Sequence, residues 1–549
     1  MNIVSYFTNY LARKEKFTWK YVVLLFLIVG LGFLLRIINL GNEPFWSDEI
    51  LSLDIVTSLG SLSSIMAYLQ TVEIHPPLYY VMLYFWTSWF GYGVFAVRML
   101  SVIFGLGVIV LVFIFTRDLF KSSRVGLLAA FLIALLPMQV EFSAEARPYI
   151  IYCFFGLLSS IMLLKYINYK KIIYVVGYVI FNSIGLYLHY SYSLILIPLS
   201  LFWLVYILHK HHRRSMYNFI IWLLAHTGIF LLFYWWLQYF LYKLFLGRFD
   251  IFGFIKFFGK FRQTIFFESI FIQTIWLNVY ESLSNVRSLL PIVIIVAFVF
   301  KVIFILALFY WVINNRVHIK KFFLSISFVV WMLVLPVIIF LFMPISQSLI
   351  HITVKHIIFV SIIGTIGISY IIMSQKIKMR ILLVVIFVAS ILNLLVAVVD
   401  NDANWAHYFN LKKYAQHINQ NYKEGDLIII KSSNNRTNLN HYLLPEAQAY
   451  ALFPASYLTY EYDLMGSRDN LGLIENEIQT RKTHKNGYSS IGELERKLSY
   501  LVNKNQATRI WLVSLDYEEE VTKWMLDNGW RRAMASLGYL FPVELYVKQ

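Results

Sequence analysis

The chain has 549 residues, of which 59% are hydrophobic and only 14% are charged. This composition excludes an ordinary soluble globular protein and is typical of a polytopic membrane protein. The formal net charge of +17 does not indicate nucleic-acid binding, because the basic residues fall in short clusters between apolar runs, as the positive-inside rule predicts. The single cysteine, Cys153, excludes a disulfide framework or a cysteine-based metal site within the chain.

Apolar runs long enough to cross a bilayer recur from Tyr21 to Val399, with basic clusters between them. If every cluster is cytoplasmic, an even number of spans must separate each cluster from the next. The run 77–92 would break this parity. It contains polar Thr87 and Ser88, and its length of about 16 residues is below the roughly 20 that a spanning helix needs. We therefore predict an interfacial or re-entrant helix there.

The remaining runs predict about eleven transmembrane helices and a cytoplasmic N-terminus. No small-residue cleavage site follows the first run, so we expect a retained span and not a signal peptide. The expected spans are 21–40, 94–116, 125–142, 149–166, 172–189, 191–208, 216–240, 290–313, 322–343, 353–373 and 381–399.

The last 150 or so residues differ in composition, since 18 of the 30 acidic residues follow Val399. Short strands are predicted at 426–431, 509–515 and 544–548, with helical patterns between them. This alternation indicates a small α/β domain. We therefore predict two domains: a membrane domain over 1–399 and an extracytoplasmic α/β domain over 400–549.

Acidic residues of the membrane domain concentrate on its predicted outer side. Asp48 and Glu49 lie in a long first outer loop, 41–93, and Glu141 and Glu145 lie in the second. No acid is expected near the middle of the bilayer, which disfavours a proton relay across it. The acids instead indicate a site at the outer face.

Basic side chains are predicted on the same face. A cation at a membrane surface suits an anionic lipid head group such as a phosphate, and a neighbouring carboxylate suits general-base catalysis. Together they predict transfer of a group from a lipid phosphate. The bases concerned are His75, Arg147, His189, Lys355 and His356, with Arg98 and Arg36 at nearby helix ends.

A Phe-rich loop is expected at 241–289. Its stretch 244–262 contains seven Phe and four basic residues. Such a composition suits a helix lying at the head-group level, where the Phe side chains would line a groove for a prenyl chain.

Five short motifs follow one another in the order typical of a known family. They are FWSDE (45–49), HPPLYY (75–80), SAEARPY (143–149), LHYSY (188–192) and VKHIIF (354–359). The chain thereby resembles the bacterial and archaeal family 39 glycosyltransferases, of the protein O-mannosyltransferase and lipid A aminoarabinose transferase type. The resemblance implies the GT-C membrane fold, a polyprenyl-phosphate sugar donor, inversion at the sugar carbon and Asp48 as general base. It implies no nucleotide cofactor and, for most members, no metal; a divalent cation is left open.

The sequence departs from the family at two points. Many relatives have Arg-Tyr where this chain has Lys355 and His356, and a lysine cannot form the bidentate fork of an arginine. No base follows Asp48 and Glu49, unlike in an aminoarabinose-transferase relative, which disfavours that particular activity.

Each candidate residue has an alternative role. Asp48 and Glu49, assigned here to catalysis, also suit the first turn of a helix capped by Ser47 or Asp48. Arg147 and Lys355, assigned with His356 and His75 to the donor phosphate, are alternatively bases that extend to the membrane interface. His75 also suits a cap of the helix beginning at Pro76. Supporting or acceptor-binding roles are assigned to Glu145, Glu141, Arg98, His189 and Arg36.

The predicted function is therefore transfer of a hexosyl or pentosyl group from a polyprenyl phosphate to a lipid, glycan or protein acceptor. We expect it at the extracytoplasmic face of a plasma (inner) membrane, with no nucleic-acid partner. The alternatives are a lipid-linked sugar flippase or transporter, and transfer of a non-sugar group from a lipid donor.

Overall fold

A computed structural model of the chain describes most of residues 19–246 and several later segments. Within 19–246 the undescribed positions are 39, 42–44, 46, 72, 74 and 210–214. The later described segments are 323–342, 358–375, 406–432, 439–453 (without 441, 445 and 448), 499–513 (without 500), 519–535 and 543–548.

The chain divides into two compact units. One, which we call the helical unit, comprises Met1–Asn42 with Ile74–Ala403. The other, which we call the sheet unit, comprises Glu43–Glu73 with Asn404–Gln549. The expected boundary at 399/400 lies outside the described residues. The grouping of 43–73 with the C-terminal part is a feature that the sequence did not predict.

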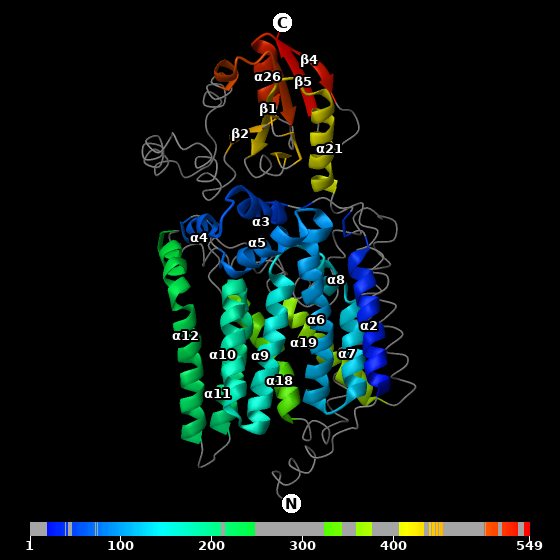
Figure 1. Cartoon of the computed structure of the whole chain (residues 1–549), viewed down its shortest axis with the longest axis vertical. Coiled ribbons are helices and arrows are strands. Elements are labelled where there is room, and N and C mark those ends of the chain that lie inside the picture. The colour runs from blue at the N-terminus through cyan, green and yellow to red at the C-terminus, as the bar shows by residue number, and fades with distance from the viewer. Residues whose placement is uncertain are drawn as a thin grey trace, which may run out of the picture. The chain divides into compact units, whose positions relative to one another are not determined.

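The helical unit contains five described helical segments that are long and apolar enough to cross a membrane. Figure 1 shows most of them running side by side. They are α2 (Trp19–Ile37), α6 (Val94–Phe120), α9 (Tyr149–Tyr169), η1 (Tyr190–Tyr192) continuing into α11 (Ser193–His209), and α12 (Ser215–Leu246).

Five further apolar helices belong to the described part of this unit. One predicted span, 125–142, is not continuous: it forms two helices, bent by 62° at Leu136, because Pro137 cannot continue the hydrogen-bonding of the first helix. The predicted spans 290–313 and 381–399 lie outside the described residues, so the count of about eleven stays a prediction. These further helices are α7 (Ser123–Leu135), α8 (Pro137–Ser143), α10 (Ile172–Leu188), α18 (Phe323–Phe342) and α19 (Ile358–Ser374).

The HPPLYY segment forms a short helix, α5 (Leu78–Phe90). Its 13 residues extend about 20 Å, too short to cross a bilayer core of about 30 Å. Pro77 caps its N-terminal end, and Gly91 caps its C-terminal end with a φ of 82°, which favours glycine. Trp86 fastens it to α6 by donating from Nε1 to the carbonyl of Ala96 at 2.7 Å. The short helix expected at 77–92 is therefore present, and its location at a membrane interface stays a prediction.

Helices α6 and α9 form the centre of the helical unit. α6 packs against α2, α7 and α9, and α9 packs against α10. Close approach is possible where a helix carries glycine: a Cβ on Gly107 would press on the ring of Phe154. Packing of this kind, with small residues at helix contacts, is the usual means of association between membrane helices.

The sheet unit contains a five-stranded sheet with the order β2-β1-β3-β5-β4. The first three strands in this order are parallel, and β5 and β4 are antiparallel to their neighbours. The predicted strands correspond to β1, β3 and β5; β2 and β4 were not predicted. The strands are β1 (Leu427–Ser432), β2 (Ala449–Phe453), β3 (Arg509–Val513), β4 (Trp530–Ala535) and β5 (Val543–Lys548).

Alternate residues of the central strands supply two separate cores, as the two-residue period of a strand requires. Trp511 of β3 and its neighbours pack with Tyr414 and Ile418 of α21 (Ala406–Asn421). Residues of opposite parity pack with Trp524 of α26 (Glu519–Asp527). The sheet is thus covered by α21 on one face and by α26 on the other.

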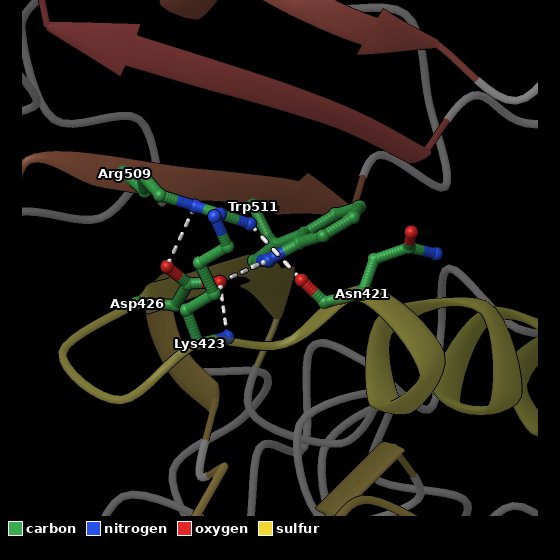
Figure 2. A network of polar contacts seen from close by, with 5 residues as sticks. All are labelled: Asn421, Lys423, Asp426, Arg509 and Trp511. Carbon is green, nitrogen blue, oxygen red and sulfur yellow. Dashed lines mark hydrogen bonds and ion pairs between the residues drawn. The ribbon is translucent and has the colours of Figure 1, made fainter.

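Asp426 joins the turn after α21 to strand β3 through a closed polar network (Figure 2). Its Oδ1 forms an ion pair with Nε of Arg509 at 2.9 Å. Its Oδ2 accepts hydrogen bonds from Nε1 of Trp511 at 2.8 Å and from the backbone N–H of Lys423 at 3.0 Å. Arg509 also donates from Nη2 to the carbonyl of Asn421 at 3.0 Å. Both oxygens of a nearly inaccessible carboxylate are therefore engaged, as in a structural ion pair.

The segment 43–73 forms two helices, α3 (Ser47–Ser58) and α4 (Leu62–Thr71). One hydrogen bond joins its start to the C-terminal part of the sheet unit, from the Tyr442 hydroxyl to the carbonyl of Phe45 at 3.3 Å. Phe45 itself is buried. The FWSDE motif therefore folds with the sheet unit.

Candidate functional site

Asp48 and Glu49 both lie in the first turn of α3. The carboxylate-bearing side chain of Glu49 is buried, with 1% of the residue exposed, whereas Asp48 is half-buried. The backbone of Asp48 is fixed by Ser52, whose hydroxyl donates to the Asp48 carbonyl at 2.9 Å. A negative charge in a first turn is favoured by the helix dipole. The first-turn position expected under the capping alternative is thus observed, and the two adjacent acids differ in accessibility.

In the helical unit, three helix ends bring bases together. His75 immediately precedes Pro76 and Pro77, which lead into α5, and Arg147 precedes Pro148, the N-cap of α9. His189 is the C-cap of α10. Proline suits the first turn of a helix because its φ is already helical and it has no N–H to satisfy. The two proline-initiated helices thus place His75 and Arg147 at their N-terminal ends.

The ring of His189 is the centre of this group, which we call the His189 cluster. Its centroid lies 5.5 Å from that of His75, 5.5 Å from that of Tyr149 and 5.8 Å from that of Tyr152. The guanidinium carbon of Arg147 lies 5.9 Å from the centre of the Tyr149 ring, within the range of a cation–π interaction. The structure therefore brings together three of the predicted residues, His75, Arg147 and His189.

The protonation of His189 is constrained by its backbone environment. Its Nδ1 accepts a hydrogen bond from the N–H of Ser191 at 3.0 Å. In the neutral imidazole the proton must then reside on Nε2. His189 is buried, so the cluster contains a histidine held in a donor orientation.

Two further candidate acids of the helical unit lie in α8 and in the loop that joins it to α9. Glu145 is buried and Glu141, in α8, is partly exposed. The backbone N–H of Arg147 donates to the Glu145 carbonyl at 2.8 Å, and the Ser101 hydroxyl donates to the Arg147 carbonyl at 3.4 Å. Glu145 is thus two residues from the cation of the cluster and shares its loop.

Arg98 and Arg36 contact backbone carbonyls. Arg98 donates from Nη1 to the carbonyl of Leu40 at 3.1 Å. Arg36 donates to three carbonyls, those of Gly32, Ala134 and Gln139. A guanidinium with such contacts donates hydrogen bonds to backbone carbonyls that lack an intrahelical partner near a helix end.

Lys355 and His356 lie outside the described residues. Tyr149 and Tyr152 were missed because the sequence analysis sought charged groups, although Tyr149 closes the SAEARPY motif and is visible there. Within the described segments, no three His, Cys, Asp or Glu side chains gather as metal ligands would.

Comparison with known proteins identifies the fold. Residues 74–239 match the family model for dolichyl-phosphate-mannose-protein mannosyltransferase. The chain is similar to the crystal structure of ArnT from Cupriavidus metallidurans in the apo state, with a TM-score of 0.56 and 12% identity over 96% of this chain and 97% of that one. It is also similar to ArnT from the same organism bound to undecaprenyl phosphate, with a TM-score of 0.57 and 11% identity over 95% of this chain and 97% of that one. No curated relative matches the sequence.

These matches confirm the resemblance to GT-C glycosyltransferases that the motifs indicated. The family match covers three of the five motifs, those at 75–80, 143–149 and 188–192. At 11% and 12% identity the structural similarity establishes the fold, and the roles of individual residues rest on the geometry of this chain.

Proposed function

We propose that this multi-pass membrane protein with the GT-C fold transfers a sugar from a polyprenyl-phosphate donor to an acceptor at the extracytoplasmic face, with inversion. The observation that carries the proposal is the His189 cluster: His75 lies beside His189, whose neutral ring carries its proton on Nε2, and Arg147 lies over Tyr149, a neighbour of the same ring. Such donors suit the phosphate of a departing lipid, where negative charge accumulates in the transition state. The structure of ArnT bound to undecaprenyl phosphate supports a polyprenyl phosphate as the class of lipid donor.

The proposed reaction exchanges one bond at the anomeric carbon of the sugar. The Asp48 carboxylate takes the proton of the acceptor hydroxyl or amine, whose lone pair attacks the anomeric carbon from the face opposite the phosphate. The bond from that carbon to the phosphate oxygen breaks, and polyprenyl phosphate leaves with the electron pair. Glu49, buried beside the half-exposed Asp48, orients the acceptor or pairs with a base.

The cations stabilise the leaving group in this scheme. Arg147 and His75 bind the phosphate oxygens, and Lys355 and His356 join them. Glu145 and Glu141 support the loop that carries Arg147. Charge-assisted hydrogen bonds of this kind are the strongest that a protein can offer to a phosphate, and they strengthen as the phosphate gains charge.

The proposed topology has about eleven spans, a cytoplasmic N-terminus and an extracytoplasmic C-terminal domain. It places the donor at the outer leaflet, where lipid-linked sugars replace nucleotide sugars. The C-terminal domain is proposed to recognise the acceptor or to cover the site. The Phe-rich loop 241–289 is proposed to hold the prenyl chain.

The test is transfer from labelled polyprenyl-phosphate sugars, both hexosyl and pentosyl, by the full chain in membranes. Asp48→Asn should reduce transfer by about a hundredfold or more, the usual effect of losing a general base. Asp54→Asn is the matched control, because Asp54 lies on the same helix, α3, and is also half-buried. It should leave transfer unchanged.

Three outcomes would contradict the proposal. Full transfer by Asp48→Asn would remove Asp48 as the base. Movement of the labelled donor between leaflets without its consumption would favour a flippase. Consumption of a lipid donor that carries a non-sugar group, with no use of any sugar donor, would favour the other transferase class.

A further inference from the structure

Arg36 is a buried cation whose hydrogen-bond partners, within the described residues, are all backbone carbonyls. It lies in the last turn of α2 and is 1% exposed. Its Nη1 donates to the carbonyls of Gly32 at 3.0 Å and Ala134 at 3.1 Å, and its Nη2 donates to that of Gln139 at 3.3 Å. One side chain of α2 thus contacts both α7 and α8.

The two contacts lie on either side of the break between these helices. α7 ends at Leu135, Leu136 is extended with φ −63° and ψ 118°, and α8 begins at Pro137. The break leaves carbonyls of α7 without their usual intrahelical donors. At membrane depth such groups must be satisfied by other parts of the protein. Arg36 supplies donors to Ala134 before the break and to Gln139 after it.

The surrounding helices enclose the guanidinium. A Cβ on Gly105 of α6 would lie 3.3 Å from Nε of Arg36, and a Cβ on Gly32 would lie 3.4 Å from its Nη1. Nε has no partner among the described residues and faces the Gly105 backbone. The guanidinium therefore has its donors turned toward protein, and a direct contact with substrate does not follow from its charge.

The helix that Arg36 holds leads into the His189 cluster. The Ser143 hydroxyl, at the end of α8, donates to the Gln139 carbonyl that Arg36 also contacts. The Gln139 side chain donates to Ser361 of α19 at 2.9 Å. After Ser143 the chain reaches Glu145 and Arg147 within four residues.

We propose that Arg36 is a positioning residue. It fastens the break between α7 and α8 to α2, and thereby holds the loop 144–147 so that Arg147 lies beside Tyr149 and the His189 cluster. Its importance for sugar transfer rests on the proposed function, whereas its effect on the loop does not.

The lone cysteine makes a direct test possible. Cys153→Ser removes the buried native thiol, and Ala144→Cys places a reporter at the end of α8. A second background carries Ser122→Cys, in the turn between α6 and α7. The rate of maleimide labelling of the full chain in detergent micelles reports local opening at each site.

Arg36→Met should raise the labelling rate at position 144 by about fivefold or more and leave position 122 unchanged, because only the loop loses its support. Arg36→Lys, which retains a cation but not the planar fork, should raise it by about twofold. Arg117→Met is the matched control: this arginine of α6 pairs with Asp118 at the surface and should alter neither rate. Equal labelling at 144 in Arg36→Met and the parent would overturn the proposal, as would an equal rise at both positions.

If the Arg36→Met protein does not accumulate, the test uses Arg36→Lys alone. An unchanged labelling rate at position 144 in Arg36→Lys would then overturn the proposal. A transfer assay adds a second readout: Arg36→Lys should lower kcat by about tenfold with a donor KM changed less than about twofold, because the residue does not contact the ground-state donor. Labelling requires no substrate. A raised labelling rate at position 144 in the Arg36 variants, with no sugar transfer by the intact chain, would refute the proposed function and support the positioning role. Sugar transfer by the intact chain, with unchanged labelling in the Arg36 variants, would support the proposed function and refute the positioning role.

Discussion

The N–H of Ser191 donates a hydrogen bond to Nδ1 of His189 at 3.0 Å. This contact caps the short η1 helix and at the same time decides which ring nitrogen carries the proton. Substitution of His189 by asparagine or by glutamine separates the capping role from the proton-donating role. Asparagine reproduces the acceptor at the position of Nδ1, and glutamine reproduces a donor near the position of Nε2.

If His189 donates to the leaving phosphate, His189→Gln should retain more transfer activity than His189→Asn. We expect a loss of about tenfold for glutamine and about a hundredfold for asparagine, the range typical of one donor to a developing charge. Thermal stability should show the opposite order, because only asparagine keeps the bond to Ser191. The same order in activity and stability would indicate a purely structural histidine.

Arg147 offers a prediction about donor binding. Arg147→Ala should weaken binding of polyprenyl phosphate by about tenfold or more, because it removes a buried cation next to Tyr149. Arg147→Lys should recover only part of this affinity, since an ammonium lacks the bidentate fork. Binding is measured by native mass spectrometry or a fluorescence titration in micelles. Arg124→Ala changes an exposed arginine of α7 and should have no effect; equal affinities for all variants would exclude Arg147 from the phosphate site.

The ion pair between Asp426 and Arg509 predicts a local effect on the sheet unit. Asp426→Asn leaves the partly buried guanidinium of Arg509 without its carboxylate and should destabilise this unit by about 2 kcal/mol, the usual cost of losing a hydrogen-bonded charged group. Amide hydrogen exchange followed by mass spectrometry should show faster exchange in peptides from β1 and β3, with helices α6 and α9 unchanged. Glu424→Gln, two residues away and exposed, is the control. Unchanged exchange in β1 and β3 would mean that the network in Figure 2 contributes little.

Two buried tyrosines of the helical unit form a matched pair. The Tyr192 hydroxyl lies 2.9 Å from that of Ser159 and donates to Oδ1 of Asn182 at 3.0 Å, whereas the Tyr178 hydroxyl has no partner among the described residues. Tyr192→Phe should lower stability in micelles by about 1 kcal/mol, because two polar groups lose their partner inside the bundle. Tyr178→Phe should be neutral or slightly stabilising. Equal melting temperatures for the two variants would contradict this assignment.

The elements most visible in the sequence are those that a single physical requirement dictates. A bilayer core about 30 Å thick demands long apolar runs, and α2, α6, α9 and α12 begin within a few residues of their predicted positions. The short α5 was predicted by the parity of the basic clusters. The central strands β1 and β3 were predicted because they are buried on both faces and nearly continuous in apolar residues.

Elements at the edge of the sheet were not visible in this way. β2 and β4 each pair with only one neighbour. β2 is a short apolar run of five residues, whereas an edge strand such as β4 can carry charged residues. β4 reads WRRAMA, with both of its arginines exposed. The break at Leu136 was missed for a related reason, since the apolar run continues through Pro137 without a change in composition.

The residue types of the candidate site followed from the sequence, because a lipid phosphate requires cations and an acceptor requires a base. The sequence did not predict which of these side chains would gather in one cluster and which would bind backbone carbonyls. His75, Arg147 and His189 meet because three helix ends converge, whereas Arg36 and Arg98, of the same charge, donate to carbonyls. Charge can be read from composition, but only the folded backbone decides whether a guanidinium faces a ligand or an unsatisfied helix end.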